Sequence, residues 1–185
     1  YAGNSTNDGM TSHGGNVDII RSLRSTGSIL KPLLYAGLQG SGEILPNTLV
    51  ADIPTRFPGF TPENFDKSYS GAIPAGEALS QSLNIPAVGM LRRYSVERFL
   101  ELLKKTGFTT FNMDADHYGL SIILGGGETS LWELGGVYAS LSRVLGRYNS
   151  EKSYISGDYH PPVITQNTSS KDDNTKEGNP PLSAA

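Results

Sequence analysis

Cysteine is absent from this 185-residue chain, so neither disulfides nor thiolate chemistry contribute to its fold or function. No apolar run is long enough to span a bilayer. The 15 basic residues are scattered and the net charge is -3, which gives no reason to expect a nucleic acid partner. The three histidines, His13, His117 and His160, lie far apart without metal-ligand spacing. We therefore expect neither a metal ion nor a cofactor.

The length suits one domain or part of one, and the 22 glycines and 11 prolines indicate many turns and connections. The chain opens at Tyr1 as if inside a strand, and we expect it to be an excerpt from a longer polypeptide. Residues 1–150 are assigned to the N-terminal part of one domain. Residues 151–185 are expected to form a flexible loop and the start of a further element, with the domain cut off at its C-terminal end.

Apolar periodicity predicts several helices. They lie at about residues 28–36, 75–80, 86–94, 96–106 and 130–144. A short strand is predicted at residues 17–20, and residues 120–124 form a short apolar run of strand or buried-turn type. The interval 37–73 is punctuated by prolines, and we expect it to be an extended, ordered excursion over the surface.

Ser28 and Lys31 place a hydroxyl and an amine one helical turn apart at an expected helix start. Proline is tolerated in the first turn of a helix, so Pro32 fixes that start close to Ser28. A serine hydroxyl becomes nucleophilic when a base takes its proton, and a lysine three residues on lies on the same helix face. Free N–H groups at the helix start favour the oxyanion of an acyl transfer. The spacing predicts a nucleophilic serine, although four residues of this pattern also recur by chance.

A second hydroxyl and a carboxamide follow at Ser82 and Asn84, in a short segment between two predicted helices. A turn clamped between helices can aim both groups at one point, which suits proton relay and the binding of a substrate amide. The same triplet occurs at Ser5-Thr6-Asn7, where a glycine-flanked turn explains it. Ser-x-x-Lys followed by Ser-x-Asn is the active-site signature of the penicillin-binding and serine β-lactamase group.

The chain resembles the class A penicillin-binding proteins well beyond these two motifs. Residues 24–32, around Ser28, resemble the nucleophile segment of that family. Further similar segments follow in order at residues 52–55, 62–66, 77–79, 82–87 and 124–128. Asn16-Val17-Asp18, together with Asp52-Ile53-Pro54-Thr55, is most similar to the 1C branch of the family. The similarity runs from residue 1 to about residue 145.

The resemblance implies a β-lactamase/transpeptidase-like (DD-peptidase) fold of the α+β class. Only part of it is expected here, namely a mostly helical subdomain and the early strands of the central antiparallel sheet. The implied function is a peptidoglycan D,D-transpeptidase that forms a serine acyl-enzyme, with stem peptides and β-lactams as its ligands. The parent is expected to be anchored in the bacterial inner membrane, to face the periplasm and to carry an upstream glycosyltransferase domain. A β-lactamase or β-lactam sensor of the same fold, or a non-catalytic binding domain, are the alternatives.

The family's site residues map onto four positions of this chain. Ser28 corresponds to the nucleophile and Lys31 to its base. Ser82 corresponds to the group that relays a proton, and Asn84 to the residue that binds the substrate amide. The family also needs Lys-Thr-Gly or Lys-Ser-Gly on an edge strand after the glycine-rich segment at 124–128, and we expect that motif to lie beyond Ala185.

Lys105-Thr106-Gly107 matches the third motif by its letters, but we interpret it differently. It falls at the end of the helix predicted at residues 96–106, where cations and a terminating glycine are typical. The following residue is the bulky Phe108, whereas the family usually has threonine or serine there. The isolated chain is therefore expected to carry half of a site and to show little or no transpeptidase activity.

Overall fold

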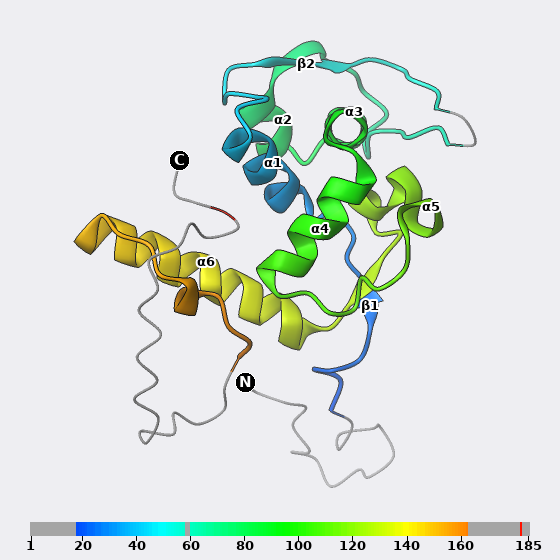
Figure 1. Ribbon diagram of the computed structural model, residues 1–185. Helices are drawn as coiled ribbons and strands as arrows, with labels where there is room; N and C mark the ends of the chain where they lie inside the picture. Colours follow the sequence, from blue (N-terminus) through cyan, green and yellow to red (C-terminus); the bar gives the residue numbers. More distant parts are fainter. Residues whose placement is uncertain (1–17, 58–59, 163–181, 183–185) are drawn as a thin grey trace, which may run out of the picture.

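The computed structural model describes residues 18–57, 60–162 and 182 (Figure 1). The α-helices of this part are α1 (Lys31–Gly40), α2 (Ala75–Ser80), α3 (Asn84–Tyr94), α4 (Val96–Thr106), α5 (Ala115–Tyr118) and α6 (Leu131–Glu151). Its strands are β1 (Arg24–Ser25), β2 (Leu49–Asp52), β3 (Gly71–Pro74) and β4 (Glu128–Thr129). Two 3-10 helices are found at Gly119–Leu124 and Ser156–Asp158. Mostly helical, with short antiparallel strand pairs, this part has the predicted α+β class.

Helix α1 lies inside the helical part, where α2, α3 and α4 pack against it and α6 runs along the opposite side (Figure 1). Its buried leucines follow the helical repeat and contribute to one continuous core. The largest fully buried side chains of that core are Phe99, Phe108, Phe111, Leu30, Leu33, Leu34, Leu38, Leu91 and Leu103. A Cβ at Gly37 would lie 2.7 Å from Leu102 Cδ2, so glycine permits the close approach of α1 and α4.

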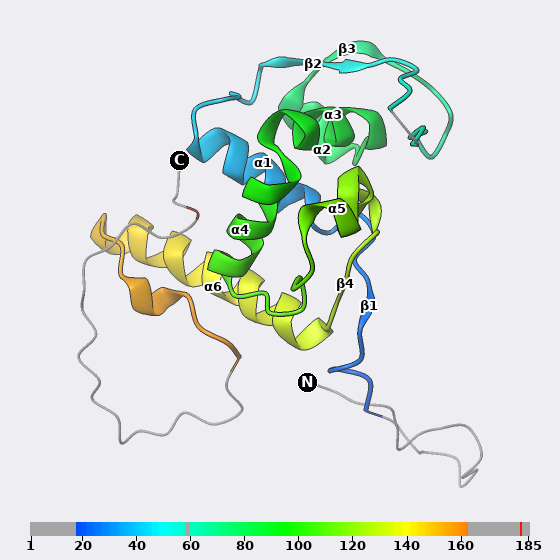
Figure 2. The ribbon, with the colours of Figure 1, turned by 45° about the vertical axis from the view of Figure 1, so that its right-hand side comes forward.

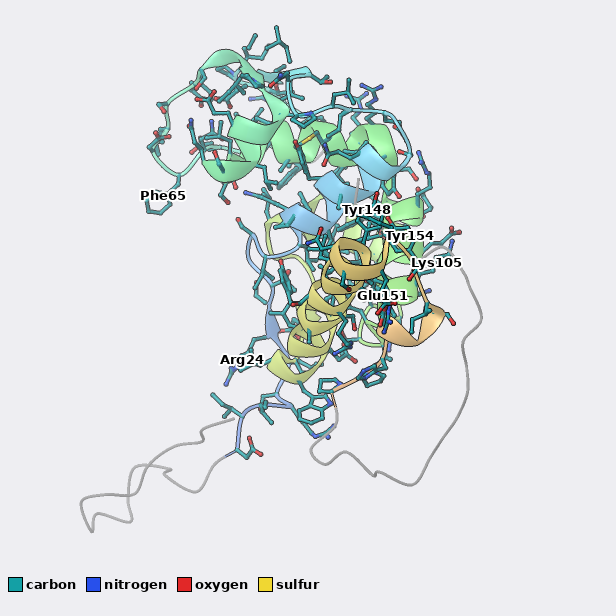
Figure 3. All side chains as sticks on the ribbon, turned by 90° about the vertical axis from the view of Figure 1, so that its left-hand side faces the viewer. Arg24, Phe65, Lys105, Tyr148, Glu151 and Tyr154 are labelled. Atoms are coloured by element: carbon teal, nitrogen blue, oxygen red, sulfur yellow. The ribbon has the colours of Figure 1, made fainter. Side chains whose placement is uncertain are left out.

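The two strand pairs lie at different ends of the helical part. Strand β1 pairs with β4 in antiparallel fashion, with Arg24 opposite Thr129, and Figure 2 shows the two side by side. Strand β2 pairs with β3, with Leu49 opposite Pro74 and Asp52 opposite Gly71. Between β2 and β3 the chain makes an excursion, residues 53–70, whose Phe65 projects fully exposed from the molecule (Figure 3). The predicted excursion at 37–73 is thus shorter than expected, because α1 extends to Gly40 and two strands form.

Several helix bounds agree with the sequence predictions. Helices α2 and α4 have the predicted limits, and α4 begins with the Ser95 hydroxyl accepting from Arg98 N and ends at Gly107 in the left-handed region, with φ +110°. Helix α6 begins at the predicted cap, where Ser130 Oγ accepts from Glu133 N. It continues to Glu151, past the predicted end at about 144, because Arg147 pairs with the buried Asp158 of a later segment.

Other predictions are wrong or fall outside the described residues. The helix expected from Ser28 begins at Lys31, and residues 18–20 form no strand. Residues 120–124 lie in a 3-10 helix. Of the two predicted forms, strand or buried turn, this matches the buried turn. Most of residues 151–185, predicted as a flexible loop and the start of a further element, lies outside the described part, as does the turn at Ser5-Thr6-Asn7. Within that part no helix combines the length and apolar character needed to cross a membrane.

Candidate active site

Ser28 lies in the turn formed by residues 27–30, immediately before α1. Gly27 has φ +52°, which lets the chain leave β1 and reverse into this turn at little steric cost. The Ser28 carbonyl accepts a hydrogen bond of 3.1 Å from Lys31 N, and Pro32 occupies the second position of the helix. The Ser28 side chain is exposed. The predicted nucleophile is therefore accessible from solvent at the entrance to a buried helix.

The glycine-rich loop at residues 125–127 supports the turn that carries Ser28. Thr26 donates to the Gly127 carbonyl through its backbone N, at 3.1 Å, and through Oγ1, at 3.3 Å. Ser25 Oγ donates to the Gly125 carbonyl at 2.8 Å. Gly125 has φ +103°, and a Cβ there would lie 2.6 Å from Ser25 Oγ and 3.0 Å from Gly27 Cα. Only glycine fits this position without displacing the turn.

A second support for the same turn comes from α6. Tyr138 Oη donates a hydrogen bond of 3.0 Å to the carbonyl of Ile29, the residue after Ser28. Burial raises the pKa of the Tyr138 phenol, which keeps it protonated and able to donate. The serine turn is therefore attached to the glycine-rich loop on one side and to α6 on the other.

Lys31 is the buried charge of the site, with 3 % of its surface exposed. Its Nζ donates to the Ser82 carbonyl at 2.7 Å, to Ser82 Oγ at 3.2 Å and to Asn84 Oδ1 at 2.7 Å. Burial lowers the pKa of Lys31 from its ordinary value of 10.5 to about 8, because desolvation disfavours the ammonium. At pH 7 about a tenth of such amines are neutral and able to accept a proton, whereas an exposed lysine is almost entirely charged.

Ser82 lies in the turn between α2 and α3, as predicted, whereas Asn84 already belongs to α3, which begins two residues before its predicted start. Ser82 is exposed and adopts φ +54°, which is unusual for a residue other than glycine. Asn84 is half-buried as the first residue of α3, and its Nδ2 donates to the Glu63 carbonyl at 2.7 Å. Since Nδ2 faces Glu63, the Oδ1 of Asn84 is turned toward Lys31.

The structure thus brings three of the four predicted residues together by direct hydrogen bonds, with Lys31 Nζ at the centre and Ser82 and Asn84 around it. Ser28 stands on the turn that leads into Lys31. An amine with a lowered pKa, a hydroxyl and a carboxamide can perform proton transfer and amide binding during acyl transfer, and the exposed Ser28 precedes that amine by three residues.

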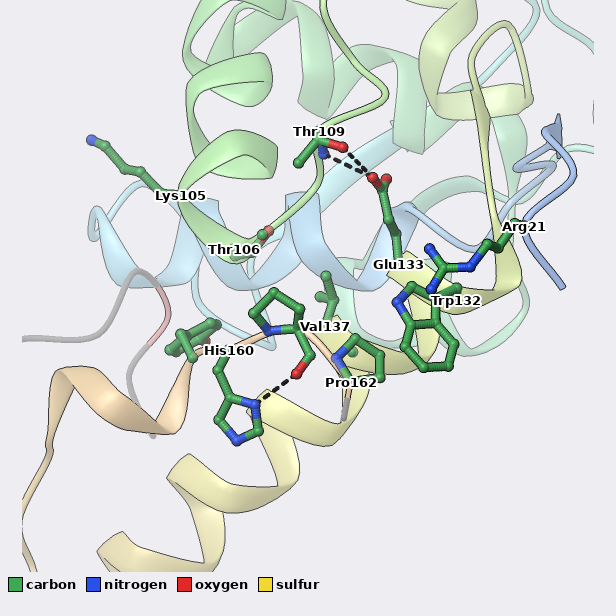
Figure 4. Close-up of a pocket in the computed structure, with 13 residues that line it drawn as sticks. Arg21, Lys105, Thr106, Thr109, Trp132, Glu133, Val137, His160 and Pro162 are labelled. Carbon is green, nitrogen blue, oxygen red and sulfur yellow. Dashed lines mark hydrogen bonds between the residues drawn. The ribbon is translucent and has the colours of Figure 1, made fainter. Parts of the chain in front are cut away.

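Lys105, Thr106 and Gly107 lie elsewhere, at the end of α4. They line a cavity of about 290 Å³ (Figure 4) with other residues that include Trp132, Glu133 and His160. This cavity is lined by none of the four predicted site residues. Thr106 Oγ1 donates to the Leu103 carbonyl at 2.9 Å, as a helix-end threonine often does. These contacts account for the three residues as the end of a helix.

Glu133 is the most strongly hydrogen-bonded group of that cavity. Its carboxylate accepts from the backbone and hydroxyl of Thr109 and from the hydroxyls of Thr110 and Thr129 (Figure 4 shows the Thr109 bonds). These bonds lower its pKa although burial opposes the shift. With its oxygens so occupied, Glu133 fixes the loop after α4 to α6. In the described part of the chain, no group of three or more acidic or histidine side chains could hold a metal ion.

Several residues that support the site had no predicted role. Tyr138 and the glycines at 125–127 contact the serine turn across more than ninety positions of sequence. Asn64 lies within the segment 62–66 that resembles the family. Its side chain is buried, donates a hydrogen bond to Asp52 and accepts one from Asn84 N. Nothing in the sequence pattern indicates its partners.

Comparisons with known proteins agree with the predicted family. No protein-family model matches the chain. Penicillin-binding protein 1C of Escherichia coli K12 is 38 % identical over 129 residues, which is 70 % of this chain and 17 % of that protein. Penicillin-binding protein 1A of Neisseria meningitidis is 30 % identical over 127 residues, 65 % of this chain and 15 % of that protein. The chain thus spans about a sixth of the length of these curated relatives.

Solved structures give the same result for the fold. Penicillin-binding protein 1A of Haemophilus influenzae aligns with a TM-score of 0.58 and 26 % identity, over 68 % of this chain and 19 % of that one. The penicillin-binding protein PonA1 of Mycobacterium tuberculosis aligns with a TM-score of 0.67 and 19 % identity, over 90 % of this chain and 45 % of that one. PonA1 has also been solved in complex with penicillin V. The expected fold and the resemblance to the 1C branch are both confirmed.

Proposed function

Since the chain is homologous to a segment of the class A penicillin-binding proteins, we propose that the polypeptide carrying it is a peptidoglycan D,D-transpeptidase. The reaction would transfer the acyl group of one D-Ala-D-Ala stem peptide to the amine of a neighbouring stem. β-Lactams would react with the same serine as substrate mimics. The chain itself contributes the serine, lysine and Ser-x-Asn elements of the site.

The buried Lys31 is the observation that supports this proposal most directly. Its amine is held by Ser82 and Asn84 one turn away from an exposed serine, and burial lowers its pKa to about 8. A lysine with a purely structural role would need neither burial nor a lowered pKa. The lowered pKa suits a group that takes and returns a proton near neutral pH, and the three acceptors fix the position of its nitrogen.

In the proposed reaction Ser28 Oγ attacks the carbonyl carbon of the penultimate D-alanine, and neutral Lys31 takes the hydroxyl proton. The C–N bond to the terminal D-alanine breaks, and the leaving amine receives a proton relayed through the Ser82 hydroxyl. Asn84 holds the amide of the stem peptide through its remaining hydrogen-bonding capacity. The acceptor amine then attacks the Ser28 ester, loses its proton by the same route and releases Ser28 with its proton restored.

The test is acylation of the full-length polypeptide by a labelled penicillin. Tandem mass spectrometry should locate one penicilloyl group on Ser28, and Ser28→Ala should carry none while keeping its thermal unfolding midpoint. Absence of an adduct in a folded protein would contradict the proposal and favour a non-catalytic binding domain. Release of the adduct within seconds would instead indicate a β-lactamase.

The resemblance also implies where the parent protein is located and which domains accompany this chain. By the same resemblance, the parent would be anchored at the periplasmic face of the bacterial inner membrane with a glycosyltransferase domain upstream. The third motif would follow this chain, and residues 1–150 would be the N-terminal part of the transpeptidase domain. The isolated chain should then cross-link no stem peptides, whereas the full-length protein should do so in the same assay.

A further inference from the structure

A buried carboxylate at the end of β2 and a buried carboxamide on the excursion between β2 and β3 lie next to the site. Asp52, at the end of β2, is 0 % exposed, and Asn64 is 2 % exposed. Asp52 Oδ1 accepts from Asn64 Nδ2 at 2.7 Å, and Oδ2 accepts from Ser70 N at 2.8 Å. Such groups are costly to bury unless every polar atom has a partner, and both have theirs.

Asp52 determines how the Asn64 amide is oriented. A carboxylate only accepts hydrogen bonds, as does the Ser68 carbonyl, to which Asn64 Nδ2 donates its second bond at 2.9 Å. The NH2 group must therefore face Asp52 and Ser68, which leaves the carbonyl oxygen of Asn64 pointing the other way. That oxygen faces the start of α3.

Asn64 caps α3 from outside the helix. Leu83, at the N-cap position, provides no side-chain cap. Asn64 Oδ1 instead accepts from Asn84 N at 3.0 Å and from Ile85 N at 3.3 Å. Backbone N–H groups at a helix start have no partner within the helix, so a cap from another segment fixes both the helix and its neighbour.

The excursion therefore holds Asn84 at two points. The Glu63 carbonyl accepts from Asn84 Nδ2, and the adjacent Asn64 side chain accepts from Asn84 N. With these two bonds made, Asn84 Oδ1 faces Lys31 Nζ at 2.7 Å. A continuous set of hydrogen bonds thus leads from Asp52 through Asn64 and Asn84 to the amine of Lys31.

We infer that Asp52 and Asn64 are positioning residues of the site: by capping α3 from the excursion, they hold Asn84 in the orientation that meets Lys31 and the substrate amide. This inference rests on the proposed function for its catalytic consequence. The capping geometry itself does not depend on the reaction. Neither residue contacts the substrate in this scheme, and both act through Asn84.

A double-mutant cycle in the full-length polypeptide tests whether Asn64 acts through Asn84. Asn64→Ala should lower the rate of Ser28 acylation by a labelled penicillin by about 10-fold or more, because Asn84 loses its backbone anchor. In an Asn84→Ala background, the same Asn64→Ala change should cost less than about 3-fold, because the positioned group is already gone. Equal losses in both backgrounds, or no loss in the first, would overturn the inference.

Matched variants separate positioning from loss of the fold. Asp116→Asn changes an exposed carboxylate in the first turn of α5, outside this set of hydrogen bonds, and should leave the rate unchanged. Asn64→Asp places two carboxylates together and should be more damaging than Asn64→Ala. Adding Asp52→Asn restores a carboxylate–carboxamide pair, so the double variant should recover acylation relative to Asn64→Asp alone. A double variant no better than Asn64→Asp would contradict the pairing, even if Asn64→Ala fails to fold.

Hydrogen exchange gives a readout that needs no activity. In Asn64→Ala the backbone amides of Asn84 and Ile85 should exchange faster than in the parent, by about 10-fold or more, while those in the middle of α4 keep their protection. Unchanged exchange at both amides would disprove the capping role. If exchange responds as expected but Ser28 takes no penicillin in the parent, the proposed function fails and the positioning of α3 stands.

Discussion

The two halves of the site are held by different means. The acceptors that hold the Ser28 turn are backbone carbonyls: those of Gly125, Gly127 and Ile29 accept from hydroxyls of Ser25, Thr26 and Tyr138. The Lys31 corner is held through side chains, with a lysine, a serine and two asparagines among its donors and acceptors. The first half depends on close approach of the chain and the second on matched polarity. Substitutions that add side-chain volume should therefore damage the first half, and substitutions that change a polar group should damage the second.

Lys31→Arg is the sharpest test of the second half, with the largest expected effect. Arginine keeps the positive charge and several donors, but it stays protonated at any working pH and cannot serve as a base. We expect the rate of Ser28 acylation by a labelled penicillin to fall by about 10³-fold or more. The matched control is Lys104→Arg at the exposed end of α4, which should leave the rate within about 2-fold. An active Lys31→Arg variant would exclude Lys31 as the base.

Gly125→Ala is the corresponding test of the first half. The new Cβ would meet Ser25 Oγ and Gly27 in a backbone conformation that alanine rarely adopts. We expect a loss of about 1–3 kcal/mol in the free energy of unfolding and a loss of about 100-fold in acylation as the Ser28 turn shifts. Urea titration and stopped-flow acylation measure the two effects.

Gly146→Ala is the control for that change. Gly146 lies in α6, and a Cβ there has nothing within 4 Å. Alanine should stabilise the helix by about 0.5–1 kcal/mol and leave acylation unaltered. If Gly125→Ala behaved like Gly146→Ala, the glycine loop would have no part in holding the serine.

The dependence of acylation on pH tests the lowered pKa of Lys31. The proton acceptor is the neutral amine, so the rate should rise with pH below the pKa of about 8 and level off above it. The expected change is about 10-fold per pH unit on the rising side. Stability should also rise between about pH 8 and 10.5, because there the unfolded chain binds a proton that the folded chain does not. A rate independent of pH between 6 and 8 would contradict the assignment.

Local sequence signals predicted some elements to the residue. Helix α4 has a serine cap, an apolar face, terminal lysines and a glycine stop, all within thirteen positions, and its limits are as predicted. The turn holding Ser82 was also predicted, since helical patterns flank it on both sides, although α3 begins at Asn84, two residues before the predicted start. These features depend on neighbours in sequence, which a pattern can show.

Long-range contacts explain what the sequence did not predict. Helix α6 extends because Arg147 meets Asp158, and β2 forms because β3 returns beside it. Within the site, the roles of Ser28, Lys31, Ser82 and Asn84 remain predictions drawn from the family. The contacts of Tyr138 with Ile29 and of Asn64 with Asn84 could not be predicted, because each joins segments that are twenty or more positions apart.

Tyr138→Phe should produce the smallest effect of the series. It removes one hydrogen bond to the Ile29 carbonyl and leaves the ring in place, and this carbonyl can turn to water because Ile29 and Tyr138 are both partly exposed. The expected cost is about 0.5–1.5 kcal/mol in stability, with acylation reduced by about 2- to 5-fold. Tyr148→Phe, at the other end of α6, keeps its stacking on Tyr154 and is the control for a lost hydroxyl. A loss in Tyr138→Phe as large as in Gly125→Ala would mean that α6, rather than the glycine loop, holds the serine turn.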